Sequence, residues 1–74
     1  IYIKSAREYV KTDIPIHFYT LLESAARKNE VAIGYRIIKE AKDANKGYGV
    51  YVNPKKSDVF TLSDEDMVIV LSED

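Results

Sequence analysis

The 74-residue sequence contains no cysteine and a single histidine, His17. Small domains often compensate for a limited core with disulfides or a bound metal. This chain lacks the side chains for a disulfide and for a cysteine or histidine zinc site. Self-association is therefore the remaining way to support a core of this size. We expect one domain over residues 1–74, as a fragment of a larger protein.

Long apolar runs are also absent. The apolar residues are scattered in short runs, and none resembles a signal peptide or reaches the length of a transmembrane helix. We therefore expect this piece of the chain to be soluble.

The chain has almost no net charge, because eleven basic residues balance twelve acidic ones to give −1. This balance argues against a nucleic-acid binder that works by neutralising phosphates. The charges are unevenly placed: residues 1–56 carry +5 and residues 57–74 carry −6. In a short compact fold the two ends can lie side by side and cancel.

One segment has the periodicity of an amphipathic helix, since its apolar residues recur at intervals of three and four. This stripe consists of Phe18, Leu21, Leu22, Ala25 and Ala26. The preceding residues 12–15 offer capping side chains and Pro15, which suits a first helical turn. The predicted helix begins near Pro15 or Ile16 and ends at Asn29, in a left-handed conformation.

Four segments have the composition of β-strands, because they are rich in β-branched and aromatic residues and are bounded by turn residues. They cover residues 1–10, 31–38, 48–52 and 67–71. Alternation along the second strand predicts a shared face for Val31, Ile33, Tyr35 and Ile37. The fold class is therefore α+β: a small, mostly antiparallel sheet in the order strand, helix, strand, strand, strand, covered by one main helix.

The polar segments between these elements predict loops. Residues 39–47 are predicted to form an exposed hairpin loop. The segment Gly47-Tyr48-Gly49 does not indicate a phosphate-binding loop, because such a loop leads into a helix and this segment leads into a predicted strand. Residues 63–66 read as a solvated turn. Its three consecutive acids lack the spacing of a calcium-binding loop.

The residue types needed for catalysis do not occur in a suitable pattern. Nucleophilic catalysis needs a Ser, Cys or Thr beside a base, and His17 is expected in the first helical turn, where a histidine is usually a surface residue. No serine is surrounded by a nucleophile-elbow pattern. We therefore expect neither enzymatic activity nor a bound cofactor.

Three segments occur together in an informative order: Ile33-Gly34-Tyr35-Arg36, then Val52-Asn53-Pro54, then residues 62–71. In this arrangement they resemble the C-terminal subdomain of RCK regulatory modules, also called TrkA-C. Residues 18–36 are similar to cytosolic segments of CASTOR/POLLUX-type ion channels and their bacterial relatives, and the resemblance covers about residues 14–71. At one position the chain departs from the pattern. Glu65 replaces the glycine that usually precedes the aspartate, so the tight turn must form differently.

The resemblance implies a cytoplasmic regulatory domain that pairs with a second copy of itself through an apolar sheet or helix surface. Such a domain would help to gate a potassium or other cation channel or transporter in response to an unknown small effector. An upstream Rossmann-type nucleotide-binding domain and a membrane pore would belong to the same parent protein. The residues that form the possible effector or interface motif are Ile33, Gly34, Tyr35, Arg36, Asn53, Pro54 and Asp66.

Two other functions are consistent with the sequence. A stand-alone module for a small molecule or single-stranded nucleic acid would use a stacking platform of Tyr35, Arg36, Tyr48 and Tyr51. Tyrosines are common in strands for packing reasons alone, and the negative net charge opposes this alternative. A fragment of an enzyme subunit is the second alternative, and it would require catalytic residues outside the 74 residues.

Overall fold

The computed structural model describes residues 1–72. Within these residues the fold consists of six strands, one α-helix and three short 3₁₀ segments. The elements run in the order β1 (Tyr2–Ser5), η1 (Ala6–Glu8), β2 (Pro15–His17), α1 (Phe18–Ala26), β3 (Glu30–Arg36), η2 (Ile38–Glu40), η3 (Ala44–Gly49), β4 (Val50–Val52), β5 (Val59–Thr61) and β6 (Met67–Ser72). The predicted α+β class is confirmed.

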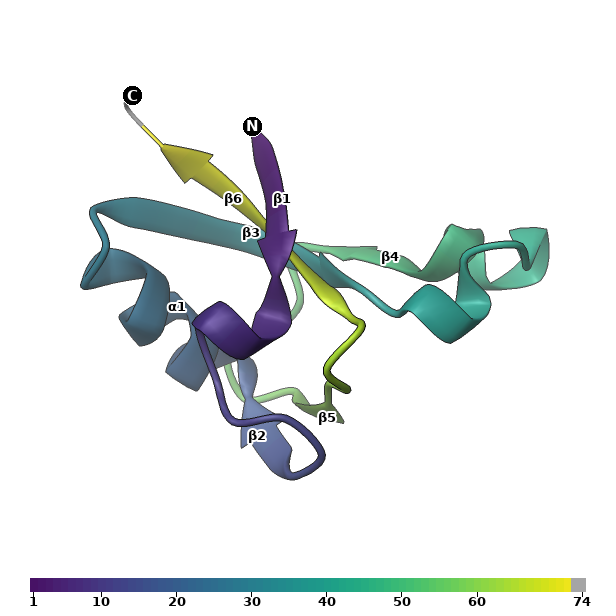
Figure 1. The fold of residues 1–74 in the computed structure, drawn as a ribbon, viewed down its shortest axis with the longest axis horizontal. Helices are drawn as coiled ribbons and strands as arrows, with labels where there is room; N and C mark the ends of the chain where they lie inside the picture. Colours follow the sequence, from purple (N-terminus) through teal and green to yellow (C-terminus); the bar gives the residue numbers. More distant parts are fainter. Residues whose placement is uncertain (73–74) are drawn as a thin grey trace.

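The main sheet has four antiparallel strands in the order β1-β6-β3-β4. These are the four strands expected from the sequence. The helix α1 lies beneath this sheet, and the 3₁₀ segments between β3 and β4 extend away from it to one side (Figure 1). The sheet is therefore covered by the helix on one face only.

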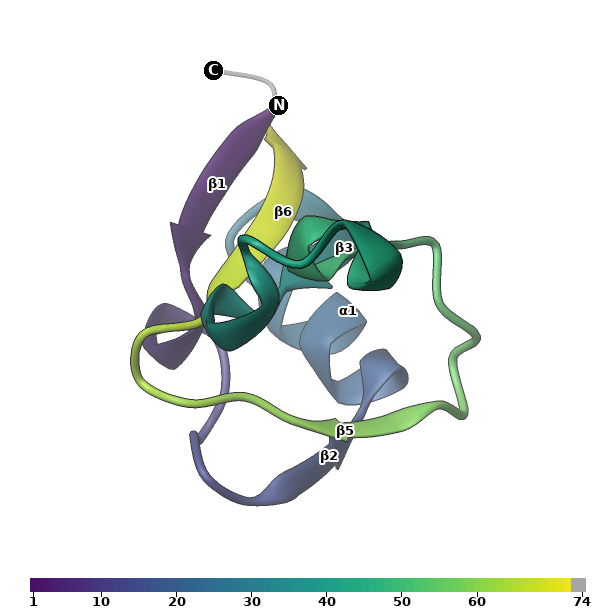
Figure 2. The ribbon, with the colours of Figure 1, turned by 90° about the vertical axis from the view of Figure 1, so that its right-hand side faces the viewer.

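The small two-stranded sheet of β2 and β5 corrects the expected start of the helix. Pro15 and Ile16 are extended and pair with Thr61 and Phe60, so the helix begins at Phe18. His17 consequently lies in the strand and at the N-cap position, not in the first helical turn. Figure 2 shows this pair of strands at the opposite end of the molecule from β1 and β6.

The start of α1 explains why the boundary moved. The first backbone N–H groups of a helix have no partner within the helix. Those of Phe18 and Tyr19 donate to the carbonyl oxygens of Asp58 and Lys56, at 3.0 and 3.1 Å. These contacts come from a segment about forty residues further along the chain, so local sequence signals did not reveal them. The left-handed conformation predicted for Asn29 is confirmed, since its φ is 60°, although the helix itself ends three residues earlier, at Ala26.

A β-bulge in β3 corrects the prediction of a shared face. Ala32 pairs with Val70 and Gly34 with Ile69, which leaves Ile33 as the extra residue. An extra residue reverses the side to which the later side chains point. As a result Ala32 and Tyr35 are buried, whereas Val31 is exposed. Val31 and Tyr35 therefore lie on opposite faces.

Two further strands are shorter than predicted. The N-terminal strand ends at Ser5, because the chain then turns through η1 and the Ala6 N–H donates to the Asp66 carbonyl. The expected strand 48–52 begins only at Val50, since Tyr48 and Gly49 have positive φ values. The expected loop 39–47 is present, but it is built largely from 3₁₀ turns.

The core lies between α1 and the covered face of the sheet. Leu21 and Ala25 of the helix belong to the same buried cluster as Val68 and Val70 of β6. Aromatic rings extend this core toward β5: Tyr35 stacks on Phe60 with ring centroids 4.1 Å apart, and Phe60 contacts Phe18 at 6.3 Å. The β2–β5 sheet thus closes the end of the core.

Candidate functional site

The seven sequence-predicted site residues lie in different environments along β3 and its neighbours. Gly34 and Arg36 lie on the uncovered face of the sheet, whereas Tyr35 points into the core. Ile33 and Asn53 meet through the backbone, because the Asn53 N–H donates to the Ile33 carbonyl at 2.7 Å. Asp66 is placed near the start of η2. These residues do not converge on a single pocket.

Gly34 has a packing role that needs no ligand. A Cβ atom at this position would lie 2.2 Å from the carbonyl oxygen of Tyr51 and 3.1 Å from the Cα of Val52. Real side chains cannot approach a backbone this closely. The glycine of the Ile-Gly-Tyr-Arg motif therefore allows β4 to pack closely against β3.

Asn53 and Pro54 end β4. Asn53 has a φ of 53°, in the left-handed region that asparagine tolerates better than most residues. Pro54 then follows without an N–H to donate, which suits the end of a strand. The predicted end of this strand at Asn53-Pro54 is confirmed.

Asp66 is a buried carboxylate, only 3% exposed. It accepts hydrogen bonds from the Ser63 N–H at 2.7 Å and from the Ile38 N–H at 2.9 Å. The prediction of a wholly solvated turn is therefore wrong for this residue, although Asp64 and Glu65 are exposed. Glu65 has no positive φ, and the Asp66 side chain holds the turn without the glycine found in the RCK pattern.

The proposed four-residue stacking platform does not form one surface. Tyr35 is 8% exposed and is covered by Phe60, while Tyr51 stacks on it with ring centroids 5.1 Å apart. Arg36 points to the opposite face of β3. Tyr48 lies outside the strands, with its carbonyl oxygen accepting a hydrogen bond from the Arg36 side chain at 3.3 Å. Bases could not stack on all four residues together.

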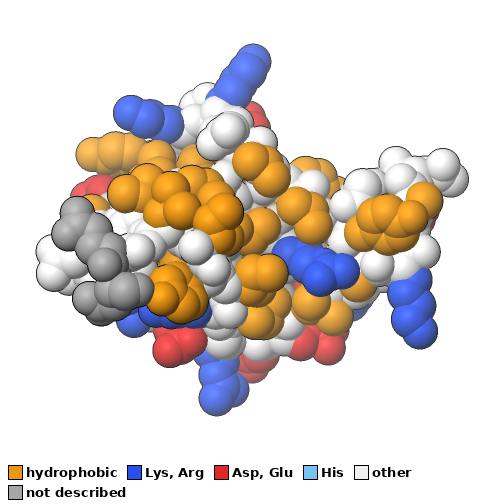
Figure 3. All heavy atoms as spheres, turned by 90° about the horizontal axis from the view of Figure 1, so that it is seen from above, with side chains coloured by type: hydrophobic (Ala, Val, Ile, Leu, Met, Phe, Trp, Pro, Cys, Tyr) orange, Lys and Arg blue, Asp and Glu red, His pale blue; other side chains and the backbone are white. Residues whose placement is uncertain are grey.

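The uncovered face of the main sheet carries a continuous set of aliphatic side chains. We call this surface the apolar sheet face; its exposed members are Ile3, Val31, Val50, Val52 and Leu71. Cross-strand pairing connects them, since Val31 is opposite Leu71, and Ile3 is linked through Ile69 and Gly34 to Val52. Figure 3 looks onto the molecule from this side and shows apolar side chains gathered over the sheet.

Only one charged residue, Arg36, occupies a strand position on this face within the described residues 1–72. Isolated exposed apolar residues are common on proteins, but a connected group of them marks an interaction site. The sequence had predicted an apolar sheet or helix surface without identifying its residues. The unbroken apolar run of residues 67–71 was the available signal, because a strand that is apolar on both faces needs a cover on each. The bulge in β3 concealed the contribution of Val31.

A buried charge on the covered side of the sheet was missed by sequence reasoning. The Glu30 carboxylate is 7% exposed and accepts hydrogen bonds from the Lys4 ammonium and the Tyr9 hydroxyl, each at 2.5 Å. The bond from Lys4, followed by that from Tyr9, lowers the pKa of Glu30 below its ordinary value of 4.5. Burial, together with the bond to Glu30, raises the pKa of Tyr9. This network links β1, the residue that follows η1, and β3.

Residues 1–72 contain no group of three or more histidine or acidic side chains placed to hold a metal ion. Among the same residues, no helix has the length and apolar character needed to cross a membrane.

Comparison with known proteins finds no family model that matches the chain and no similar curated protein. The molecule is thus defined by its fold, as an α+β domain with one uncovered apolar sheet face.

Proposed function

We propose that this chain is a cytoplasmic regulatory domain of a potassium or other cation channel or transporter, and that it works as a homodimer paired through the apolar sheet face. The observation that carries the dimer is the connected row of exposed aliphatic side chains on that face. The channel assignment rests on the resemblance of residues 14–71 to the RCK C-terminal subdomain. An upstream Rossmann-type domain and a pore in the parent protein are part of this proposal.

A second copy of the chain is the partner that fits this surface best. A face with one charge and several aliphatic residues needs an apolar partner, and the chain itself supplies one. In a two-fold dimer the same patch occurs on both subunits, so an apolar patch without strong charge is self-complementary. Burial of this face would also enlarge the small core of a domain that has no disulfide.

The proposed activity is regulation without bond making. A regulatory domain acts when an effector or neighbour binds more tightly to one of two arrangements than to the other. Pairing through the sheet face provides two subunits whose relative arrangement can change while each subunit keeps its fold. Such a change can be transmitted to an upstream domain and pore.

The dimer is tested by size-exclusion chromatography with light scattering at high micromolar concentration. Val31→Lys places a charge on the apolar sheet face and is expected to yield monomers. Val59→Lys is the matched control: Val59 is also a strand valine and is 58% exposed like Val31, but it lies in β5, away from that face. The control is expected to remain dimeric. A strictly monomeric unmodified chain would contradict the dimer.

The channel assignment is tested separately on the parent protein. Ion flux through the full-length protein is expected to change its effector response when Val31→Lys is introduced, and to keep it with Val59→Lys. A parent gene product without pore helices and without a Rossmann-type domain would contradict the channel assignment, even if the isolated domain is a dimer.

A further inference from the structure

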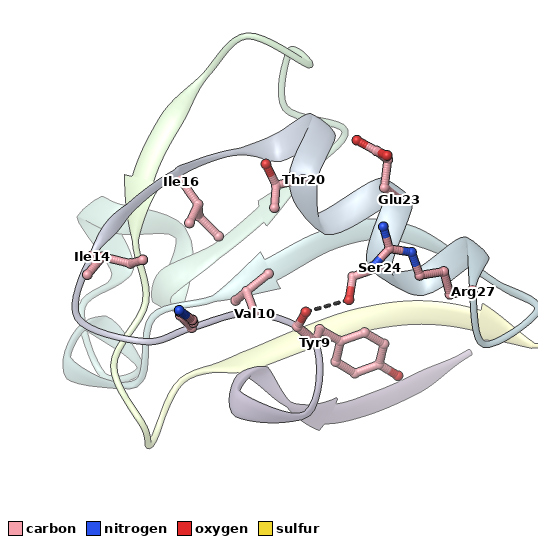
Figure 4. A pocket seen from close by; sticks show the side chains of 9 residues that line it. Tyr9, Val10, Ile14, Ile16, Thr20, Glu23, Ser24 and Arg27 are labelled. Atoms are coloured by element: carbon pink, nitrogen blue, oxygen red, sulfur yellow. Dashed lines mark hydrogen bonds between the residues drawn. The ribbon is translucent and has the colours of Figure 1, made fainter.

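A cavity lies on the other side of the molecule from the apolar sheet face, between α1 and the segment that leads into β2. Its volume is about 290 Å³, close to the lower limit for small-molecule sites. Figure 4 shows the side chains of Val10 and Ile16 directed into the space between this segment and the helix. Neither the resemblance nor the dimer proposal uses this cavity.

One wall of the cavity is apolar, and hydrogen bonds fix the segment that forms it. Val10, Ile14 and Ile16 provide its aliphatic wall. The Ser24 hydroxyl of α1 donates a hydrogen bond to the Tyr9 carbonyl, which fastens the segment to the helix (Figure 4). The Val10 N–H donates to the Ala6 carbonyl at 3.1 Å. The cavity is therefore a formed feature of the fold.

The polar part of the wall has an excess of positive charge. Lys11 and Arg27 both line the cavity, against one acidic residue, Glu23. The ion pairs within residues 1–72 join Lys4 to Glu30 and Lys46 to Glu40, so neither Lys11 nor Arg27 has an acidic partner there. Thr20, also in the wall, has a hydroxyl available as a further donor. Two unpaired cations beside an aliphatic wall are complementary to an amphipathic anion.

We propose that this cavity binds a small organic carboxylate with a short hydrocarbon part. The planar guanidinium of Arg27 can hold a carboxylate through two parallel hydrogen bonds, and Lys11 adds a compact positive charge. Val10, Ile14 and Ile16 receive the hydrocarbon part, whose removal from water favours binding. The identification of this carboxylate as the effector rests on the proposed regulatory function, whereas its binding does not.

Binding is tested by heteronuclear NMR titration of the chain with 4-methylpentanoate. Saturable shifts at millimolar concentration are expected for residues of the cavity wall. The neutral analogue 4-methylpentanamide is expected to bind about tenfold more weakly, because it lacks the charge that Arg27 and Lys11 recognise. Equal affinity for the amide would overturn the proposal. Inorganic phosphate that competes as well as the carboxylate would overturn the assignment to a carboxylate.

Variants separate recognition from folding. Arg27→Gln and Lys11→Gln are each expected to weaken binding of 4-methylpentanoate about tenfold, since both side chains are exposed and the fold does not depend on them. Arg7→Gln is the control, because Arg7 is an exposed cation near the same segment but outside the cavity wall. Circular dichroism verifies the fold of each variant. Unchanged affinity in both cavity variants would overturn the proposal.

Light scattering on the same samples distinguishes the two proposals. Carboxylate binding to a monomeric chain would leave the cavity assignment intact and contradict the dimer. A dimer that shows no saturable shifts with 4-methylpentanoate would contradict the cavity assignment and leave the dimer intact.

Discussion

Gly34 is the residue at which the backbones of β3 and β4 come closest. Substitution by alanine would place a methyl group 2.2 Å from the Tyr51 carbonyl oxygen, and the contacting atoms are backbone atoms that cannot easily move. We expect Gly34→Ala to lower the free energy of unfolding by about 1–3 kcal/mol, as overpacked sites do. Urea unfolding followed by circular dichroism measures this change.

Gly47 provides the control for Gly34. It has a φ of 59°, and a Cβ atom there would have no neighbour within 4 Å. Asparagine adopts left-handed φ values with little cost. Gly47→Asn is therefore expected to change the free energy of unfolding by no more than about 0.5 kcal/mol. Equal destabilisation by both substitutions would contradict the close-packing role of Gly34.

Glu30 makes the stability of the domain depend on pH in the acidic range. The bonds from Lys4 and Tyr9 lower the pKa of Glu30 in the folded protein below the ordinary value of 4.5 that it has in the unfolded chain. The ionised carboxylate therefore contributes its full stabilisation of the fold at pH values above 4.5. This stabilisation is lost as the pH falls through the lowered pKa. We expect the urea midpoint of the unmodified chain to fall between about pH 7 and about pH 3, and that of Glu30→Gln to change less.

The control for Glu30 is Glu65→Gln, which removes an exposed carboxylate from the turn at 63–66. This variant is expected to keep the acid dependence of the unmodified chain. The same acid dependence in Glu30→Gln as in the unmodified chain would show that the network of Glu30, Lys4 and Tyr9 does not carry the effect.

Single residues differed in how far the sequence could predict their roles. Asn29 and Asn53 were predicted at the ends of their elements, because a left-handed asparagine is a local feature. Glu30 and Asp66 were not predicted to be buried, since three of their four hydrogen-bond partners lie 21 to 28 residues away along the chain and only Ser63, beside Asp66, is local. Such burial depends on the tertiary fold, which the pattern of neighbouring residues does not contain.

At the scale of elements, β5 closes the core through Phe60. The Phe60 ring lies between Tyr35 and Phe18, so its removal would leave a cavity beneath the β2–β5 sheet. We expect Phe60→Ala to lower the free energy of unfolding by about 3 kcal/mol, at the low end for phenylalanine because the residue is partly exposed. Val59→Ala, in the same strand but exposed, is expected to cost no more than about 0.5 kcal/mol. Equilibrium urea unfolding compares the two.

The helix followed from its periodicity, and the four strands of the main sheet followed from their β-branched and aromatic composition and the turn residues that bound them. The β2 and β5 strands have three residues each and lie in different parts of the sequence. Their pairing was therefore not visible in either segment alone, and Pro15 instead suggested a helix start. The bulge at Ile33 was missed for a related reason, since it appears only in the register between β3 and β6.

At the scale of the whole molecule, the uncovered sheet face could be expected as a type of surface but not as a set of residues. Its members come from four strands, and the sequence order β1, β3, β4, β6 differs from the spatial order β1-β6-β3-β4. The cavity beside α1 was not predicted at all, because it forms where an irregular segment meets the helix. Both candidate sites depend on topology more than on local motifs.

If two copies pair through the apolar sheet face, stability becomes coupled to concentration. Mass action favours a folded dimer over two unfolded chains as the concentration rises. We expect the Tm of the unmodified chain to rise by about 3 °C for each tenfold increase in protein concentration. Val31→Lys should abolish this dependence, while Val59→Lys should retain it. Differential scanning calorimetry over a wide concentration range provides the measurement. A concentration-independent Tm for the unmodified chain would contradict a dimer whose formation stabilises the fold, and with it the idea that the small core is completed by a second copy.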